Sequence, residues 1–202
     1  MSLNKFIINT IECAANNEIA VHFICDRDFK YGGLYDGDAH TLTVCVTDSE
    51  GKIHTDWLKL LVHESCHMDQ DIEQVPVWLA SEIGDTNAFT IVDEWLNGII
   101  ELSPKQIETY IDMMQAIELD CEKRAIAKIK KYKLKIDQVQ YIKEANAYLY
   151  FYEALKETRK WTRPGKGAYR IPEVVAICPD TYQKEYKSNR EVIELIKKLC
   201  YD

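Results

Sequence analysis

Two histidines and a glutamate lie within a helical pattern in the segment Trp57-Leu58-Lys59-Leu60-Leu61-Val62-His63-Glu64-Ser65-Cys66-His67. Its apolar residues recur at helical spacing, and Asp56 stands directly before it as a candidate N-cap. On a helix, residues four apart lie on one face, with Cβ atoms about 5 to 6 Å from each other. The imidazoles of His63 and His67 can therefore reach one metal ion.

Glu64, which follows the first histidine, indicates a catalytic rather than a structural metal site. In the pattern His-Glu-x-x-His the glutamate lies beside the metal rather than on it, where it can act as a general base. Zinc lowers the pKa of a bound water to about 7, so such a base has a proton to accept at neutral pH. We interpret His63 and His67 as metal ligands and Glu64 as a catalytic base.

A catalytic zinc has three protein ligands and one open position, so another residue must complete the site. The other histidines, His22, His40 and His54, all precede the motif. The metzincin continuation requires glycine and histidine at positions 70 and 73, where this chain has Gln70 and Glu73. A third ligand is therefore expected among the downstream carboxylates.

Two downstream glutamates compete for this role. Glu82 lies in the segment 78–85, soon after the motif. Glu118 begins the string Glu-Leu-Asp-Cys-Glu at 118–122, inside a long helical pattern that opens with Ser103 and Pro104, a cap followed by a first-turn proline. The two ends of that string are four residues apart and share a helix face.

The strings at 63–67 and 118–122 resemble the two motifs of the gluzincin zinc metallopeptidases, and of the short minigluzincins among them. The resemblance implies a zincin-like fold, zinc as cofactor, and hydrolysis of peptide bonds. Carried over residue by residue, it makes Glu118 the third zinc ligand and Glu122 the carboxylate that orients a ligating histidine.

The second motif departs from the family pattern Glu-x-Glu-Ala-Asp at Asp120, Cys121 and Glu122. Glu82 stays the alternative ligand, because thermolysin-like gluzincins also place their glutamate downstream, although at a longer spacing. A donor for the oxyanion is also needed, and the sequence does not choose between several candidates. These candidates are Tyr148, Tyr152, Tyr169 and Arg170.

Composition indicates an ordinary globular protein. The chain has 202 residues, of which 47% are hydrophobic and 29% are charged, enough for one well-buried core. We expect an α+β, mostly helical fold in a single zincin-like domain over residues 1–202, with the helices of 135–202 packed on it. The net charge of −8 and the scattered basic residues argue against a nucleic-acid partner.

The start of the chain lacks a signal-peptide pattern, and no apolar stretch is long enough to cross a membrane. Its seven cysteines form no Cys-x-x-Cys pair, which indicates free thiols, most of them buried, in a reducing compartment. We therefore expect a cytoplasmic protein without a membrane partner.

Hydrophobic periodicity and turn signals divide the chain into elements. The expected helices cover 3–16, the metal motif, 77–95, 103–133, 136–161 and 180–199, and the expected strands cover 19–25 and 41–46. The segments 26–40 and 162–172 read as loops, and 48–51 closes the second strand. Thr41–Val46 is the candidate sheet edge that would bind an extended peptide substrate through its backbone.

Two functional classes remain open. The first is a zinc metallopeptidase, a hydrolase that acts on a protein or peptide. The second is a non-catalytic binding or regulatory protein in which zinc is structural. Glu64 favours the enzyme, because a structural zinc site does not need a base. A third variant, hydrolysis of a small amide, depends on the shape of the pocket, which the sequence does not give.

Overall fold

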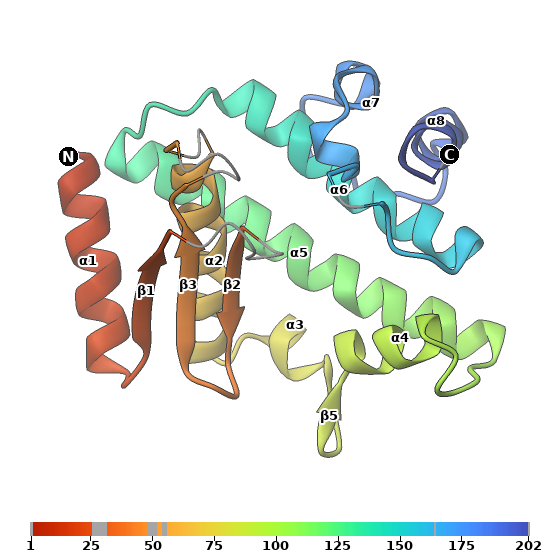
Figure 1. Ribbon diagram of the computed structural model, residues 1–202, viewed down its shortest axis with the longest axis horizontal. Coiled ribbons are helices and arrows are strands. Elements are labelled where there is room, and N and C mark those ends of the chain that lie inside the picture. The colour runs from red at the N-terminus through yellow and green to blue at the C-terminus, as the bar shows by residue number, and fades with distance from the viewer. Residues whose placement is uncertain (1, 26–31, 48–51, 54–55, 164, 202) are drawn as a thin grey trace. The chain divides into compact units, whose positions relative to one another are not determined.

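The computed structural model describes residues 2–25, 32–47, 52–53, 56–163 and 165–201. Its contacts group the chain into two compact units, the first of residues 1–75 and 121–136 and the second of residues 76–120 and 137–202. The long helix α5 (Pro104–Tyr132) contributes to both. The mostly helical α+β class expected from the sequence is confirmed (Figure 1). The single domain stays a prediction.

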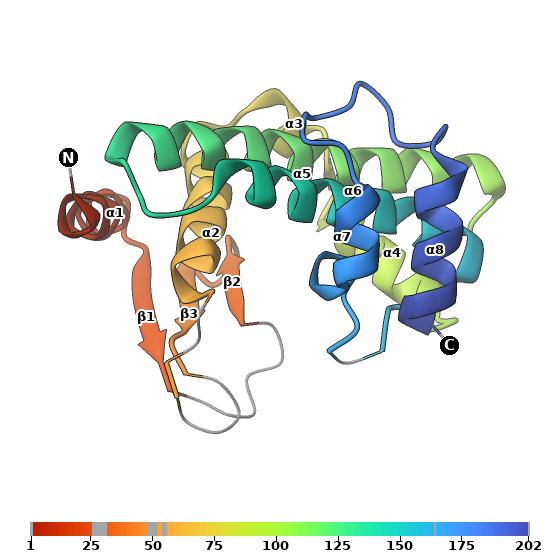
Figure 2. The same ribbon diagram turned by 90° about the horizontal axis from the view of Figure 1, so that it is seen from above.

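The first unit places a mixed sheet next to the helix that carries the metal motif. In chain order it contains α1 (Leu3–Asn16), β1 (Ala20–Ile24), β2 (Gly33–Asp36), β3 (Thr41–Cys45) and α2 (Trp57–Ile72). The strand order is β1-β3-β2, with β1 parallel and β2 antiparallel to β3. The helix α2 packs along β2 and β3 (Figures 1 and 2).

Alternating side chains of β3 explain this packing. Leu42 and Val44 are fully buried, as are Leu61 and Val62 of α2. Since successive strand residues point to opposite faces, Leu42 and Val44 belong to one face of the sheet. At the end of α5, Tyr132 contacts α1: its ring centroid lies 5.3 Å from that of Phe6, and its hydroxyl accepts a hydrogen bond from Asn9.

The strand order corrects one expectation. Thr41–Val46 was expected at the sheet edge, but β3 is the central strand, and β1 and β2 lie at the two ends of the order. The prediction of a loop over 26–40 was wrong at Gly33–Asp36, which forms the short strand β2. Glycine and aspartate are typical of turns, so the sequence pattern did not indicate a strand there. The turn expected at 48–51 lies outside the described residues.

The second unit is built mainly of helices. In chain order it contains α3 (Pro76–Leu79), β4 (Glu82–Ile83), β5 (Thr86–Asn87), α4 (Ala88–Leu96), the first part of α5, α6 (Gln138–Thr158), the 3-10 turn η1 (Ala168–Arg170), α7 (Pro172–Ile177) and α8 (Arg190–Tyr201). The first turn of α5 has the expected cap, since Ser103 and Gln106 bond each other's backbone N–H groups.

The helix expected over 77–95 is wrong. The chain breaks between α3 and α4 into the hairpin β4–β5, where Gly84 has a φ of 63° that other residues rarely adopt. Asn87 then starts α4 by accepting a hydrogen bond from the Thr90 N–H at 3.0 Å. A turn glycine and a cap residue therefore override the helical pattern.

The last helix begins at Arg190 rather than at about 180. The buried side chain of Asn146 donates hydrogen bonds to the carbonyl oxygens of Pro179 and Thr181, at 2.9 and 3.0 Å. It also accepts a hydrogen bond from the Tyr186 hydroxyl at 2.7 Å. These bonds hold the segment before α8 in a non-helical path, because they use backbone oxygens that a helix would need.

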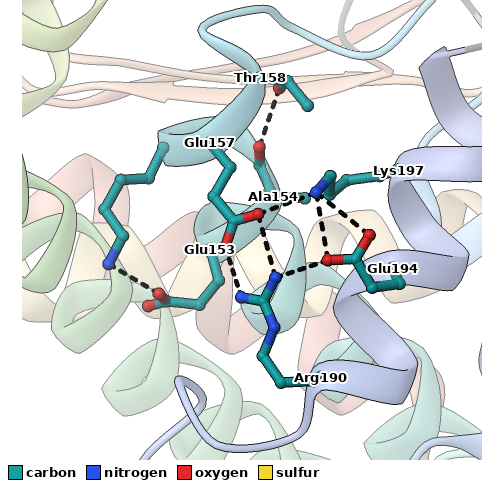
Figure 3. A network of polar contacts seen from close by, with 8 residues as sticks. Glu153, Ala154, Glu157, Thr158, Arg190, Glu194 and Lys197 are labelled. Atoms are coloured by element: carbon teal, nitrogen blue, oxygen red, sulfur yellow. Dashed lines mark hydrogen bonds and ion pairs between the residues drawn. The ribbon is translucent and has the colours of Figure 1, made fainter.

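A network of charged side chains joins α8 to α6 (Figure 3). Glu157 of α6 pairs with Arg190, and it accepts a hydrogen bond from Lys197 at 2.9 Å. Both basic residues also pair with Glu194 of α8. Hydrogen bonds, first from Arg190 and to a smaller extent from Lys197, lower the pKa of Glu157 to about 2.

Candidate metal centre

The two histidines of α2 turn their ring nitrogens toward one point. The Nε2 atoms of His63 and His67 are 3.2 Å apart, and the ring planes are nearly perpendicular. With zinc–nitrogen bonds of 2.0–2.1 Å, nitrogens at this 3.2 Å separation subtend an angle of about 100° at the metal. This angle is close to the tetrahedral value that zinc prefers, so the pair fits two ligands of one zinc ion.

The outer nitrogen of His63 faces a buried carboxylate. Its Nδ1 lies 3.1 Å from Oε1 of Glu122, which is only 5% exposed and comes from α5. A carboxylate accepts but does not donate when ionised, so it favours the His63 tautomer with the proton on Nδ1. The lone pair of Nε2 is then directed toward His67.

The outer nitrogen of His67 has a comparable acceptor that the sequence analysis missed. Its Nδ1 lies 2.8 Å from Oε1 of Gln70, a fully buried side chain on the same helix. Gln70 follows His67 by one helical turn, and this spacing is the signal that could have identified it. An amide oxygen at this place again favours a proton on Nδ1.

These contacts are compatible with a cation held between the two rings. With a proton on each Nδ1, the two Nε2 atoms bring lone pairs to within 3.2 Å of each other, which is repulsive. A proton on one Nε2 or a metal ion bound by both removes the repulsion. The donor set of two imidazoles with oriented outer nitrogens fits zinc.

Cys121 is a third metal-compatible side chain at this place. The ligand atoms of His63, His67 and Cys121 lie within 4.8 Å of one another among the described residues. The Sγ atom, however, lies 3.5 Å from Nδ1 of His63 and 3.4 Å from its carbonyl oxygen. Nδ1 and Nε2 point away from each other, so this thiol is at the edge of the ring that faces Glu122.

The carboxylate of Glu64 lies on α2 and faces the sheet. Its Oε2 accepts a hydrogen bond from the backbone N–H of Tyr35 in β2, at 2.9 Å. The side chain is 8% exposed, and its neighbour on the helix is His63. The sequence-predicted base is therefore a buried, hydrogen-bonded carboxylate and not a solvated surface acid.

Glu118 lies one helical turn before Glu122 on α5 and belongs to the second unit. It is 4% exposed and accepts a hydrogen bond of 3.3 Å from the hydroxyl of Tyr152, which is fully buried on α6. Burial and then the nearby Glu118 carboxylate raise the pKa of Tyr152. Glu118 is therefore not a solvent-exposed carboxylate, whereas Glu82 is exposed on β4.

The remaining oxyanion candidates form a chain of contacts that begins at Tyr152 in the second unit. The hydroxyl of Tyr148 lies 3.0 Å from that of Tyr152, and its ring makes an edge contact with Tyr169. Arg170 stacks over the Tyr169 ring at 5.4 Å. The geometry brings these four residues together but does not identify which of them would meet an oxyanion.

The fold and this site define an α+β protein with a candidate metal centre of two histidines on one helix. Comparison with protein-family models, with curated proteins and with solved structures found no match to this chain. In the part of the chain that the structure describes, no helix has the length and apolar character needed to cross a membrane.

Proposed function

We propose that this chain is a zinc-dependent metallopeptidase in which His63, His67 and Glu118 bind zinc and Glu64 is the general base. The observation that carries the proposal is the approach of the two Nε2 atoms to 3.2 Å while both Nδ1 atoms face oxygen acceptors. Glu118 enters as the third ligand from its sequence motif, and its burial one turn before Glu122 supports that assignment.

Zinc at this place would polarise the scissile carbonyl and acidify the attacking water. The chain's own residues have separate tasks. Glu64 would take a proton from that water and deliver it to the leaving amine. Glu122 and Gln70 keep the protons of His63 and His67 on Nδ1, so that both Nε2 lone pairs remain available.

An extended protein or peptide segment is the proposed substrate. The strand β2 lies at one end of the sheet order, packs next to α2 and contacts Glu64 through its backbone. An extended peptide can pair with the outward backbone groups of such a strand other than the Tyr35 N–H, which Glu64 binds. The free thiols of all seven cysteines support a reducing, cytoplasmic setting, and the net charge of −8 gives no support to a nucleic-acid partner.

A binding or regulatory protein with a structural zinc is the second candidate. It is favoured by one observation, the presence of Cys121 within metal-ligand range of His63 and His67. Cysteine is a common ligand of structural zinc sites, which are closed by four protein ligands. In that case Cys121→Ser would remove the metal, whereas the peptidase proposal expects Cys121→Ser to retain it.

Metal content decides the ligand set. We would measure zinc by mass spectrometry in the purified wild type and in the Glu118→Ala, Cys121→Ser and Glu82→Ala variants. One equivalent of zinc that is lost only in Glu118→Ala would support the peptidase site. Loss only in Cys121→Ser would favour the structural site, and a wild type without zinc would refute both.

Hydrolysis then separates an enzyme from a binding protein. Fluorescently quenched casein is a suitable probe because its cleavage needs no knowledge of the natural sequence. The wild type should cleave it in the presence of zinc, and Glu64→Gln should retain zinc but lose cleavage. Cleavage that persists in Glu64→Gln would exclude this residue as the base.

A further inference from the structure

We propose that the strand β2 forms a cradle that fixes the Glu64 carboxylate, and that Gly33 is its positioning residue. The inference rests on the proposed function, in which Glu64 is the general base. It adds a residue that neither of the two sequence motifs contains. Glu64 meets β2 at two places: Oε2 accepts a hydrogen bond from the Tyr35 N–H, and Cγ and Oε1 lie where a side chain at Gly33 would reach.

The first contact follows from the register of the sheet. The N–H of Cys45 donates to the carbonyl oxygen of Gly32 at 2.7 Å, and the next pairs along the ladder are Gly33 with Val44 and Leu34 with Thr43. Antiparallel pairs alternate between bonded and non-bonded, so the N–H of residue 35 points away from β3. That outward N–H is the one that binds Oε2 of Glu64.

The second contact requires the absence of a side chain. A Cβ atom at Gly33 would lie 2.9 Å from both Cγ and Oε1 of Glu64, closer than side chains normally approach. Gly33 is not among the residues with positive φ, so alanine could adopt its backbone conformation. Space for Glu64, rather than backbone freedom, is therefore the reason that glycine fits here.

The two contacts involve different atoms of the Glu64 side chain. Tyr35 binds Oε2, and the missing side chain of Gly33 leaves room for Cγ and Oε1. The Tyr35 hydroxyl also donates to Asp71, which ties β2 to the last turns of α2. A glutamate side chain has many rotamers in water, so a cradle that selects one of them prepares the base before substrate binds.

A double-mutant cycle in the metal-free protein tests the contact itself. Gly33→Ala should lower the melting temperature, because the new methyl group displaces Glu64. Glu64→Ala removes the atoms that clash, so adding Gly33→Ala to it should have little further effect. Glu64→Gln is the matched control, since it keeps the shape of the side chain and should leave the penalty of Gly33→Ala in place.

Failure to fold is also informative in this design. If Gly33→Ala does not fold but Gly33→Ala/Glu64→Ala does, the clash with Glu64 is the cause. If Gly33→Ala lowers the melting temperature equally in the Glu64→Ala background, or if neither protein folds, the cradle is refuted.

The zinc-loaded protein tests the functional consequence. Gly33→Ala should retain the zinc affinity of the wild type in competition with a chelator, while kcat for quenched casein falls about 100-fold with little change in KM. Glu64→Asp is one methylene shorter, so it should restore part of kcat in the Gly33→Ala background. An unchanged kcat in Gly33→Ala would overturn the positioning role. A wild type without zinc or cleavage would instead refute the proposed function, and the stability cycle would still decide the contact.

Discussion

The Nδ1 atom of His63 lies 3.1 Å from a carboxylate oxygen of Glu122, a residue from a different helix and 59 positions later in the chain. Both side chains are largely shielded from solvent, and Glu122 is 5% exposed. A carboxylate at this place fixes the proton of His63 and increases the electron density at Nε2. The contact therefore links the first sequence motif to the second.

Glu122→Ala should weaken zinc binding about 10- to 100-fold, because His63 loses the acceptor that fixes its tautomer. Chelator competition measures the dissociation constant directly. Glu82→Ala, which removes an exposed carboxylate of the same type, is the matched control and should bind zinc like the wild type. Unchanged affinity in Glu122→Ala would show that this carboxylate does not support the metal site.

Gln70→Ala should weaken zinc binding through His67 in the same way, by about tenfold or more. The substitution also leaves a small cavity, so its melting temperature must be measured in the metal-free state. Gln70→Glu keeps an oxygen acceptor toward Nδ1 and should bind zinc more tightly than Gln70→Ala. If both variants have the same affinity, the contribution of Gln70 is packing and not orientation.

Spacing predicted the central part of the site, since residues four apart on a helix must share a face. This rule identified His63 with His67 and placed Glu118 on the same helix face as Glu122. It could not identify Gly33, because the contact of Gly33 with Glu64 depends on how a strand packs on a helix. Gln70 was missed for a different reason, since glutamine is a common surface residue and its burial is invisible in the sequence.

The helices were predictable where apolar residues recurred at helical spacing between residues that typically start or end a helix. The bounds of α1 match the expectation, and α2, α5 and α6 begin within about two residues of it. The errors occur where a few polar residues change the backbone path, at the hairpin around Gly84 and at the contacts of Asn146 before α8. Tertiary hydrogen bonds of this kind have no local sequence signature.

Tyr152→Phe tests whether the hydrogen bond from the Tyr152 hydroxyl to Glu118 helps Glu118 to act as the third zinc ligand. The substitution removes a donor from a buried carboxylate, which should cost about 1 to 3 kcal/mol of unfolding free energy in the metal-free protein. Under the proposed function it should also weaken zinc binding. Tyr148→Phe is the control, because it removes a hydroxyl whose contact is with the hydroxyl of Tyr152. Equal losses of zinc affinity in both variants would contradict a specific role of the Tyr152–Glu118 contact.

The network between α6 and α8 predicts a pH dependence of stability. The pKa of Glu157 is lowered from its ordinary 4.5 to about 2, chiefly by the hydrogen bond from Arg190. A group whose pKa is lower in the folded than in the unfolded protein stabilises the fold above the unfolded value. That stabilisation is fully present above about pH 4.5 and is lost as the pH falls toward 2.

Glu157→Gln should therefore lower the melting temperature at pH 7 but have little effect near pH 2, as followed by circular dichroism. Glu157 is partly exposed to solvent, so the difference at pH 7 should correspond to about 1 kcal/mol or less. High salt should reduce it further, since ions screen exposed charges. Glu191→Gln, at an exposed position of the same helix α8, is the control. If Glu157→Gln lowers the melting temperature equally at pH 7 and pH 2, the loss comes from packing of α8 and not from the charge of Glu157.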